Sequence, residues 1–189
     1  MKVYFGTSPR IKDKYPKLIG DIYSLIVKFG GRHTSDWVKN VSPVEFYKLG
    51  VKELDSHQKK VNKAINLADI CIFEVSLHSL SIGYLVNYAL EHGKSVIVMG
   101  QDLKPLTIFR SLSSDKLISF VYNKSSLEEK LKKALSEAVG KNDVRFNFFV
   151  SPKILNYLDW VAKTKRIPRS VFLRGLIEKQ MRKDVSFKA

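Results

Sequence analysis

The chain has 189 residues, of which 44% are hydrophobic and 27% are charged. This composition is typical of a globular protein and excludes an intrinsically disordered one. The length allows one ordinary domain, or a domain of about 140 residues followed by a small module. The net charge of +15 favours polyanionic partners such as nucleic acid or an anionic membrane surface, and a merely basic cytoplasmic protein is the alternative.

Targeting segments and metal sites are not indicated by the sequence. The first six residues predict a strand and not a signal peptide, because no apolar stretch of secretory length follows them. No run reaches the roughly 18 apolar residues of a membrane helix. The single cysteine, Cys71, excludes an internal disulfide, and the four histidines lack metal-ligand spacing. We therefore expect a cytoplasmic protein with no membrane segment, no metal site and no cofactor.

In chain order, the first third alternates between apolar strand and helical patterns. The expected elements are a strand at 2–6, a turn-prone loop at 6–10, a helix over 15–29 that ends at Gly30-Gly31, an irregular segment or short strand and loop over 34–49, and a helix over 53–67.

The next third predicts the centre of a sheet. Residues 70–75 are too continuously apolar for a half-exposed strand, so we expect a parallel strand buried on both faces. The elements expected after it are a helix at 82–91, a strand at 95–99, a strand at 117–122 and a helix at 126–139. This alternation predicts the α/β class with a doubly wound, parallel, flavodoxin-like sheet. Ligands bind such sheets beyond the strand C-termini, where the polar loops 6–10 and 76–81 lie.

Around Gly140 the pattern changes, so we expect two domains, 1–140 and 143–185. Residues 145–150 alternate with the period of a strand, and Ser151-Pro152 is a typical helix start. A helix, a basic turn at 165–170 and a second amphipathic helix at 171–181 follow. From residue 141 onward there are 12 Lys and Arg residues and 4 Asp and Glu residues, so this segment carries +8 of the +15.

Two polar motifs of the first domain suit a phosphate-bearing ligand. They read Tyr-Phe-Gly-Thr-Ser-Pro-Arg over 4–10 and Ser-Leu-Ser-Ile-Gly-Tyr over 79–84, and they supply hydroxyls, a guanidinium and a helix N-terminus. With Glu74-Val75 before the second motif, residues 2–112 resemble the nucleoside 2-deoxyribosyltransferase superfamily, and most nearly its deoxynucleoside-monophosphate N-glycosidases. The resemblance implies a nucleotide- or phosphate-binding site made by Ser8, Arg10, Ser79, Gly83 and Tyr84. Generic polar loops on an α/β sheet are the alternative.

The catalytic pattern of that family is not complete in this chain. Members use one carboxylate as nucleophile and another for proton transfer to the leaving base. The resemblance places the nucleophile at Leu85 and the acid/base group near Val61, and neither side chain can perform these roles. Glu91 is nearly two helical turns beyond Leu85 and cannot replace it. We therefore expect no catalytic residue, and a pseudoenzyme that keeps the pocket.

The second domain resembles a ribbon-helix-helix DNA-binding module in its order of strand, Ser-Pro, helix, basic turn and helix. The resemblance implies an obligate dimer whose paired strands enter the major groove of duplex DNA. The DNA-binding residues that it implies are Arg145, Asn147, Phe149, Lys165, Arg166, Arg169 and Ser170. Two departures are an apolar Phe149 at a base-reading position and Pro168, which removes an amide at the phosphate-binding turn. A module used only for dimerisation is the alternative.

Together these features predict a homodimeric or tetrameric DNA-binding protein, a transcriptional regulator, whose catalytically silent first domain senses a nucleotide. The alternative is an active N-glycosidase or deoxyribosyltransferase that acts on deoxynucleoside monophosphates and uses the second domain to oligomerise. A scaffold that binds no small ligand is a third candidate.

Overall fold

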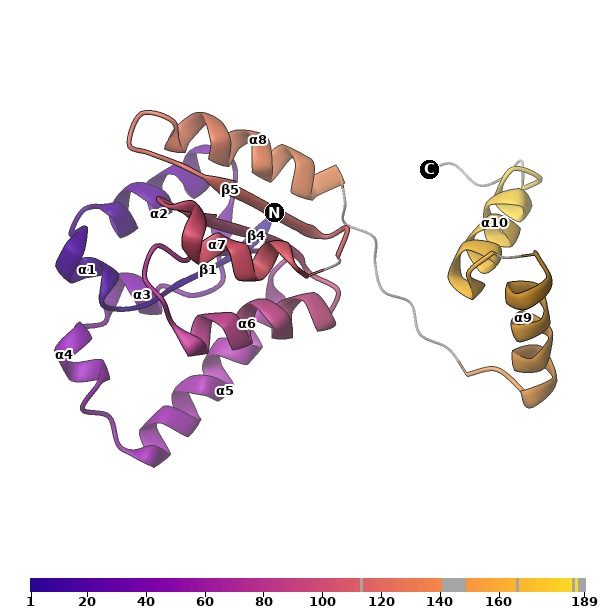
Figure 1. Cartoon of the computed structure of the whole chain (residues 1–189), viewed down its shortest axis with the longest axis horizontal. Coiled ribbons are helices and arrows are strands. Elements are labelled where there is room, and N and C mark those ends of the chain that lie inside the picture. The colour runs from indigo at the N-terminus through magenta and orange to yellow at the C-terminus, as the bar shows by residue number, and fades with distance from the viewer. Residues whose placement is uncertain (113, 141–148, 166, 185, 187–189) are drawn as a thin grey trace. The chain divides into compact units, whose positions relative to one another are not determined.

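The computed structural model describes residues 1–112, 114–140, 149–165, 167–184 and 186. The chain divides into two compact units, Met1–Arg145 and Phe146–Ala189 (Figure 1). Among the described residues, no helix combines the length and the apolar character that crossing a membrane requires.

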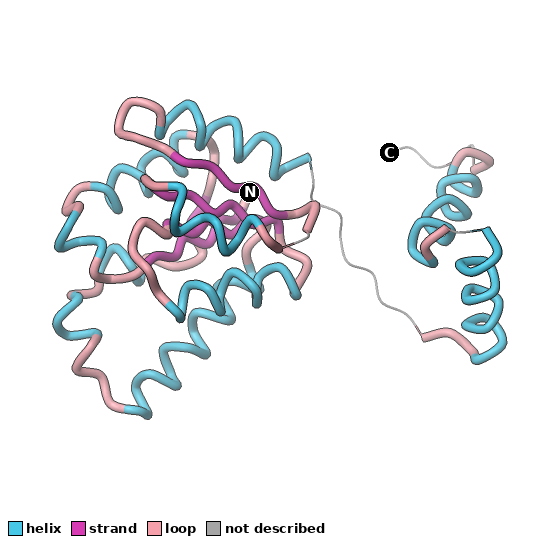
Figure 2. Tube along the Cα trace, viewed as in Figure 1, coloured by secondary structure: helices cyan, strands magenta, loops and turns pink. Residues whose placement is uncertain are grey.

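The first unit is built on a five-stranded parallel sheet, whose strands are magenta in Figure 2. The strand order is β2-β1-β3-β4-β5. The strands are β1 (Lys2–Thr7), β2 (Arg32–His33), β3 (Ile70–Glu74), β4 (Ser95–Gly100) and β5 (Leu117–Val121). The α/β class and the parallel sheet are therefore confirmed, and the strand order is that of a flavodoxin-like fold. Thr7 of β1 pairs in register with Glu74 of β3, which aligns the C-terminal ends of these two strands.

Helices cover both faces of the sheet. Those of the first unit are α1 (Ile11–Lys14), α2 (Leu18–Lys28), α3 (Trp37–Asn40), α4 (Pro43–Phe46), α5 (Val51–Leu67), α6 (Leu80–Glu91), α7 (Leu103–Arg110) and α8 (Leu127–Gly140). Ile70 and Ile72 pack with α2 and α8 on one face, whereas Cys71 and Phe73 pack with α5, α6 and α7 on the other. Because successive side chains of a strand point to opposite faces, this packing explains the apolar run over residues 70–73 of β3.

Two differences from the expected elements lie near the candidate site. The segment 34–49, expected to be irregular or a short strand and loop, contains the two short helices α3 and α4. Pro43 opens α4, and Ser42 caps it by accepting a hydrogen bond from the amide of Glu45 at 3.5 Å. The second difference is α7, a helix not expected from the sequence. Pro105 falls in its first turn, where the missing N–H costs no helical hydrogen bond.

The second unit contains the two helices α9 (Pro152–Lys165) and α10 (Arg169–Met181). The hydroxyl of Ser151 accepts a hydrogen bond from the amide of Ile154 at 3.4 Å, which caps the start of α9. An ion pair between Arg169 and Asp159 connects the two helices. Most of the expected strand, residues 145–148, lies outside the described residues, so the order helix–turn–helix is observed and the ribbon is not among the described elements.

Candidate functional site

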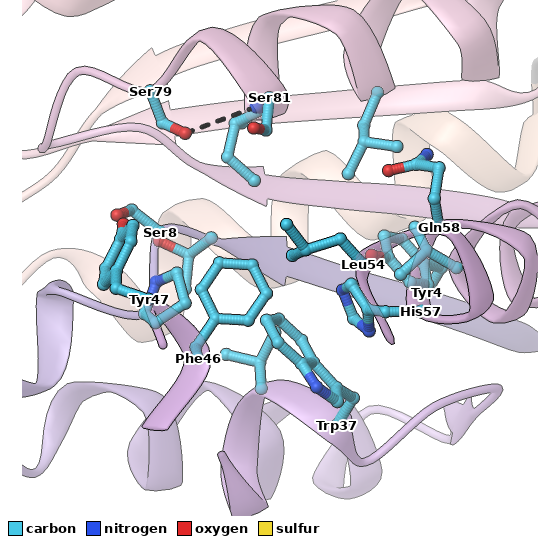
Figure 3. Close-up of a pocket in the computed structure, with 16 residues that line it drawn as sticks. Tyr4, Ser8, Trp37, Phe46, Tyr47, Leu54, His57, Gln58, Ser79 and Ser81 are labelled. Atoms are coloured by element: carbon cyan, nitrogen blue, oxygen red, sulfur yellow. Dashed lines mark hydrogen bonds between the residues drawn. The ribbon is translucent and has the colours of Figure 1, made fainter. Parts of the chain in front are cut away.

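A cavity lies at the C-terminal ends of β1 and β3, where the sequence predicted a ligand site. Its lining comes from the loop after β1, from α3 to α5, and from the start of α6 (Figure 3). The lining residues are Tyr4, Thr7, Ser8, Pro9, Trp37, Val38, Phe46, Tyr47, Leu54, His57, Gln58, Val61, Ser79, Ser81, Ile82 and Leu85.

Hydroxyl groups form one side of this cavity. Ser8 is only 2% exposed, and its Oγ atom has no hydrogen-bond partner in the described structure. Ser79 is the N-cap of α6, where its Oγ atom accepts a hydrogen bond from the amide of Ile82 at 3.4 Å. Ser8 and Ser79, two of the predicted binding residues, therefore line the same cavity although they are 71 positions apart in the sequence.

Aromatic rings form a second part of the lining, which we call the aromatic wall: Trp37, Phe46, Tyr47 and His57 (Figure 3). The Trp37 ring centroid lies 4.1 Å from that of His57 and 5.1 Å from that of Phe46. The Phe46 and Tyr47 centroids are 5.3 Å apart. Burial, and to a smaller extent the charge of Lys60, lowers the pKa of His57, which favours its neutral form. The wall is therefore an uncharged surface suited to stacking against a planar ring.

Arg10 lies beside the cavity without lining it. Its Nη2 atom donates a hydrogen bond to the carbonyl oxygen of His78 at 2.9 Å, and its guanidinium lies 6.0 Å from the ring centroid of Tyr47. Arg10 thus connects the loop after β1 with the residue that precedes Ser79. The side chain is exposed, so its other N–H groups face a region that a ligand can reach.

Gly83 and Tyr84, the other two predicted binding residues, lie on a neighbouring apolar groove between α6 and α7. Ser79 lines both this groove and the cavity. The structure therefore separates the five predicted residues into Ser8 and Ser79 on the cavity, Arg10 beside it, and Gly83 and Tyr84 on the groove.

The two positions that the family resemblance assigned to catalysis meet in the cavity. Leu85 is 6% exposed and Val61 is 4% exposed, and both contribute to its lining. Neither can attack a sugar carbon or transfer a proton, and none of the residues that line the cavity is Asp or Glu. The lining residues offer hydrogen bonding, stacking and one group that can exchange a proton, the imidazole of His57.

The aromatic wall was missed by the sequence analysis, although one signal pointed to part of it. His57 and Gln58 lie four and three residues before Val61 on α5, so they share its face of the helix. The expectation that Val61 lies in the site therefore implies that His57 and Gln58 lie in the site as well. Trp37 and Phe46 carry no such signal, since their segment has no helical periodicity.

The predicted DNA-binding residues are only partly described. Arg145, Asn147 and Arg166 lie outside the described residues. Phe149 is fully exposed, Lys165 ends α9, and Arg169 and Ser170 begin α10. The guanidinium of Arg169 is engaged by Asp159, which places it at the turn between the helices.

Known proteins resemble this chain in structure more clearly than in sequence. No protein-family model matches the chain, and no curated protein matches it significantly. The CMP N-glycosidase BcmB of Clostridium botulinum is 19% identical, with a TM-score of 0.49, over 72% of this chain and 98% of that one. That protein is described as an N-glycosidase, and nothing in the comparison bears on DNA binding.

Proposed function

We propose that the first unit binds a nucleotide in the cavity at the ends of β1 and β3. The observation that carries this proposal is the Oγ atom of Ser8, which is buried and has no hydrogen-bond partner in the described structure. An unpartnered buried hydroxyl costs about 1–3 kcal/mol, so such groups call for an explanation. A ligand oxygen or nitrogen that reaches Ser8 removes this cost.

The two sides of the cavity match the two ends of a nucleotide. The aromatic wall suits a nucleobase, because stacking a base on an aromatic side chain contributes about 1–3 kcal/mol. Ser8 and Ser79, with Arg10 beside them, suit phosphate or sugar oxygens. The N-terminus of α6, a helix of 12 residues that begins directly after Ser79, adds a favourable field for an anion.

Binding without cleavage is the form of this function that the lining residues support best. Hydrolysis of an N-glycosidic bond by the family's route needs two carboxylates, and the corresponding positions hold Leu85 and Val61. The N-glycosidase alternative is tested directly by incubating micromolar protein with CMP and dCMP and measuring free cytosine by chromatography. Base release above the buffer control that is lost on Ser8→Ala would support the enzyme and contradict the silent pocket.

Calorimetric titration with CMP, cytidine and inorganic phosphate tests the binding proposal. We expect CMP to bind more tightly than cytidine, because only the monophosphate makes charge-assisted hydrogen bonds. Ser8→Ala should weaken CMP binding. Ser95→Ala is a matched control, because Ser95 is a buried serine in the first residue of β4, at the opposite end of the sheet from the cavity. Equal affinities for CMP and cytidine, or no binding by either, contradict the proposal.

The second unit supports a second candidate function, self-association followed by binding of duplex DNA. Its two helices expose many large apolar side chains and bury only Leu158 and Val161. The exposed ones, between 40% and 57% accessible, are Ile154, Leu155, Tyr157, Trp160, Val171, Leu176, Ile177 and Met181. A unit of this size rarely buries enough apolar surface alone, and a second copy supplies the missing contacts.

Salt dependence tests the DNA part of this candidate. The charge of +8 after residue 140 predicts that anisotropy titrations of the full chain with a labelled duplex show affinity falling steeply as salt rises, because bound lysines and arginines release counterions. Lys165→Ala should weaken all duplexes alike, whereas Asn147→Ala should reduce sequence preference. Absence of duplex binding at low salt would restrict the second unit to self-association.

A further inference from the structure

A buried carboxylate that the proposed function does not use contacts Thr7, a residue of the cavity lining. Glu74 ends β3 and is 1% exposed. Its Oε1 atom accepts hydrogen bonds from the amide of Ser76 at 3.2 Å, from the hydroxyl of Ser76 and from the hydroxyl of Tyr122 at 3.0 Å. Its Oε2 atom lies 3.3 Å from the hydroxyl of Thr7. That hydroxyl has one proton and lies nearer, at 2.9 Å, to the carbonyl oxygen of Glu74.

These partners come from the ends of four strands. Thr7 is the last residue of β1, Ser76 follows β3, and Tyr122 follows β5. The fourth strand joins through Ser76, whose hydroxyl oxygen accepts a hydrogen bond at 2.8 Å from the amide of Gln101, just after β4. The Glu74 carboxylate is therefore the common acceptor of a network that holds β1, β3, β4 and β5 together at their C-terminal ends.

The network is suited to a charged carboxylate. Burial is the larger influence and raises the pKa of Glu74 above the usual carboxyl value, while the hydrogen bonds from Ser76, Tyr122 and Thr7 act in the opposite direction. Ser76 and Tyr122 donate to the carboxylate, which as an ionised group only accepts, and Thr7 shares its one proton between the carboxylate and the carbonyl oxygen of Glu74. The same burial, and then the neighbouring Glu74 charge, raises the pKa of Tyr122, so the phenol keeps the proton that it donates.

Both loops of the cavity begin at residues that this carboxylate holds. Thr7 lines the cavity and directly precedes Ser8. Ser76 opens the short loop that leads to Ser79, the N-cap of α6. A shift of either residue moves a hydroxyl of the cavity, whereas the aromatic wall on α3 to α5 has no hydrogen bond to Glu74 among the described contacts.

We propose that Glu74 is the positioning residue of the nucleotide site. Its carboxylate binds Ser76 directly and Thr7 through the longer of that residue's two contacts with Glu74, and thereby sets where the hydroxyls of Ser8 and Ser79 stand. Glu74 itself does not touch the ligand. This inference rests on the proposed nucleotide-binding function and adds to it a residue that is not in the lining of the cavity.

Glu74→Gln tests the proposal in the full chain, with CMP as the titrant. The amide has nearly the shape of the carboxylate, but it has lost the charge and presents N–H groups to hydrogen-bond donors. We expect CMP affinity to fall about tenfold. This is the loss expected when one charge-assisted hydrogen bond to the ligand is no longer well positioned. Ser95→Ala, at the far end of the sheet, should leave the affinity unchanged.

A double-mutant cycle separates positioning from general loosening of the fold. If Glu74 acts through the loop of Ser8, Glu74→Gln combined with Ser8→Ala should bind CMP little worse than Glu74→Gln alone. Glu74→Gln combined with His57→Ala, on the aromatic wall, should show effects that multiply within about a factor of two. Multiplicative effects in both pairs would refute positioning and leave Glu74 a structural residue.

The outcomes distinguish this proposal from the function on which it rests. If wild-type protein does not bind CMP, the nucleotide site is refuted and Glu74 loses this role with it. If wild-type protein binds CMP and Glu74→Gln binds it equally well, only the positioning role is refuted. Should Glu74→Gln fail to fold, Tyr122→Phe decides the matter, because it removes one hydrogen bond to the carboxylate and should weaken CMP binding several-fold.

Discussion

Replacing Ser8 by alanine should stabilise the free protein while weakening its ligand binding. In the described structure the Ser8 Oγ atom is buried without a hydrogen-bond partner. Removing an unsatisfied buried polar group recovers its desolvation cost of about 1–3 kcal/mol, less the contacts of the lost oxygen, so we expect a gain of about 1 kcal/mol. Ser8 thus contributes nothing to folding that alanine cannot supply.

This gain is measurable by thermal and chemical unfolding. In a domain of about 150 residues, 1 kcal/mol shifts the melting temperature by about 2–4 °C. The matched comparison is Ser95→Ala, because Ser95 is equally buried and its hydroxyl donates a hydrogen bond to the carbonyl oxygen of Ala138 at 3.3 Å. That variant should lose about 1 kcal/mol, so the two serine replacements should shift the melting temperature in opposite directions.

Addition of CMP should reverse the order of the melting temperatures of wild type and Ser8→Ala. A ligand that binds only the folded state stabilises it by an amount that grows with affinity. At saturating CMP the wild-type protein should therefore gain more than the variant. If Ser8→Ala lowers the melting temperature as much as Ser95→Ala does, the Ser8 hydroxyl has a partner in the free protein and the reasoning fails.

Three further predictions address the wall, the buried carboxylate and the second unit. Trp37→Ala should weaken CMP binding by about 1–3 kcal/mol in calorimetry, because a stacking surface is lost. Trp37→Phe should keep most of the affinity, and equal losses in the two variants would contradict stacking. Because burial raises the pKa of Glu74 above 4.5, the folded chain holds this proton more tightly than the unfolded chain does. The free energy of unfolding therefore falls as pH rises through the folded-state pKa. Urea titrations should show wild type losing stability relative to Glu74→Gln above pH 4.5. Ile177→Asp, on an exposed apolar position of α10, should shift the full chain toward monomer in sedimentation, and Lys179→Asp on the same helix should not.

The sheet and the position of the cavity were predictable because they depend on local patterns. A strand buried on both faces favours apolar residues at successive positions, and residues 70–73 of β3 show this directly. Glycine marks the helix ends, and Gly30 and Gly93 adopt φ angles of 80° and 71°, which other residues rarely adopt. Polar loops after buried strands of a parallel sheet indicated where Ser8 and Ser79 meet.

The contents of the cavity were decided by tertiary structure. Trp37 and Phe46 lie on helices of four residues each, too short to show a periodicity, and they become a wall only because α5 brings His57 against them. The Glu74 network likewise joins residues separated by 67 and 48 positions. Patterns along the chain report which side chains are buried, because buried positions recur with the period of a helix or a strand. They do not report which distant side chains meet. That depends on the order in which the strands pair and on how the helices pack over them.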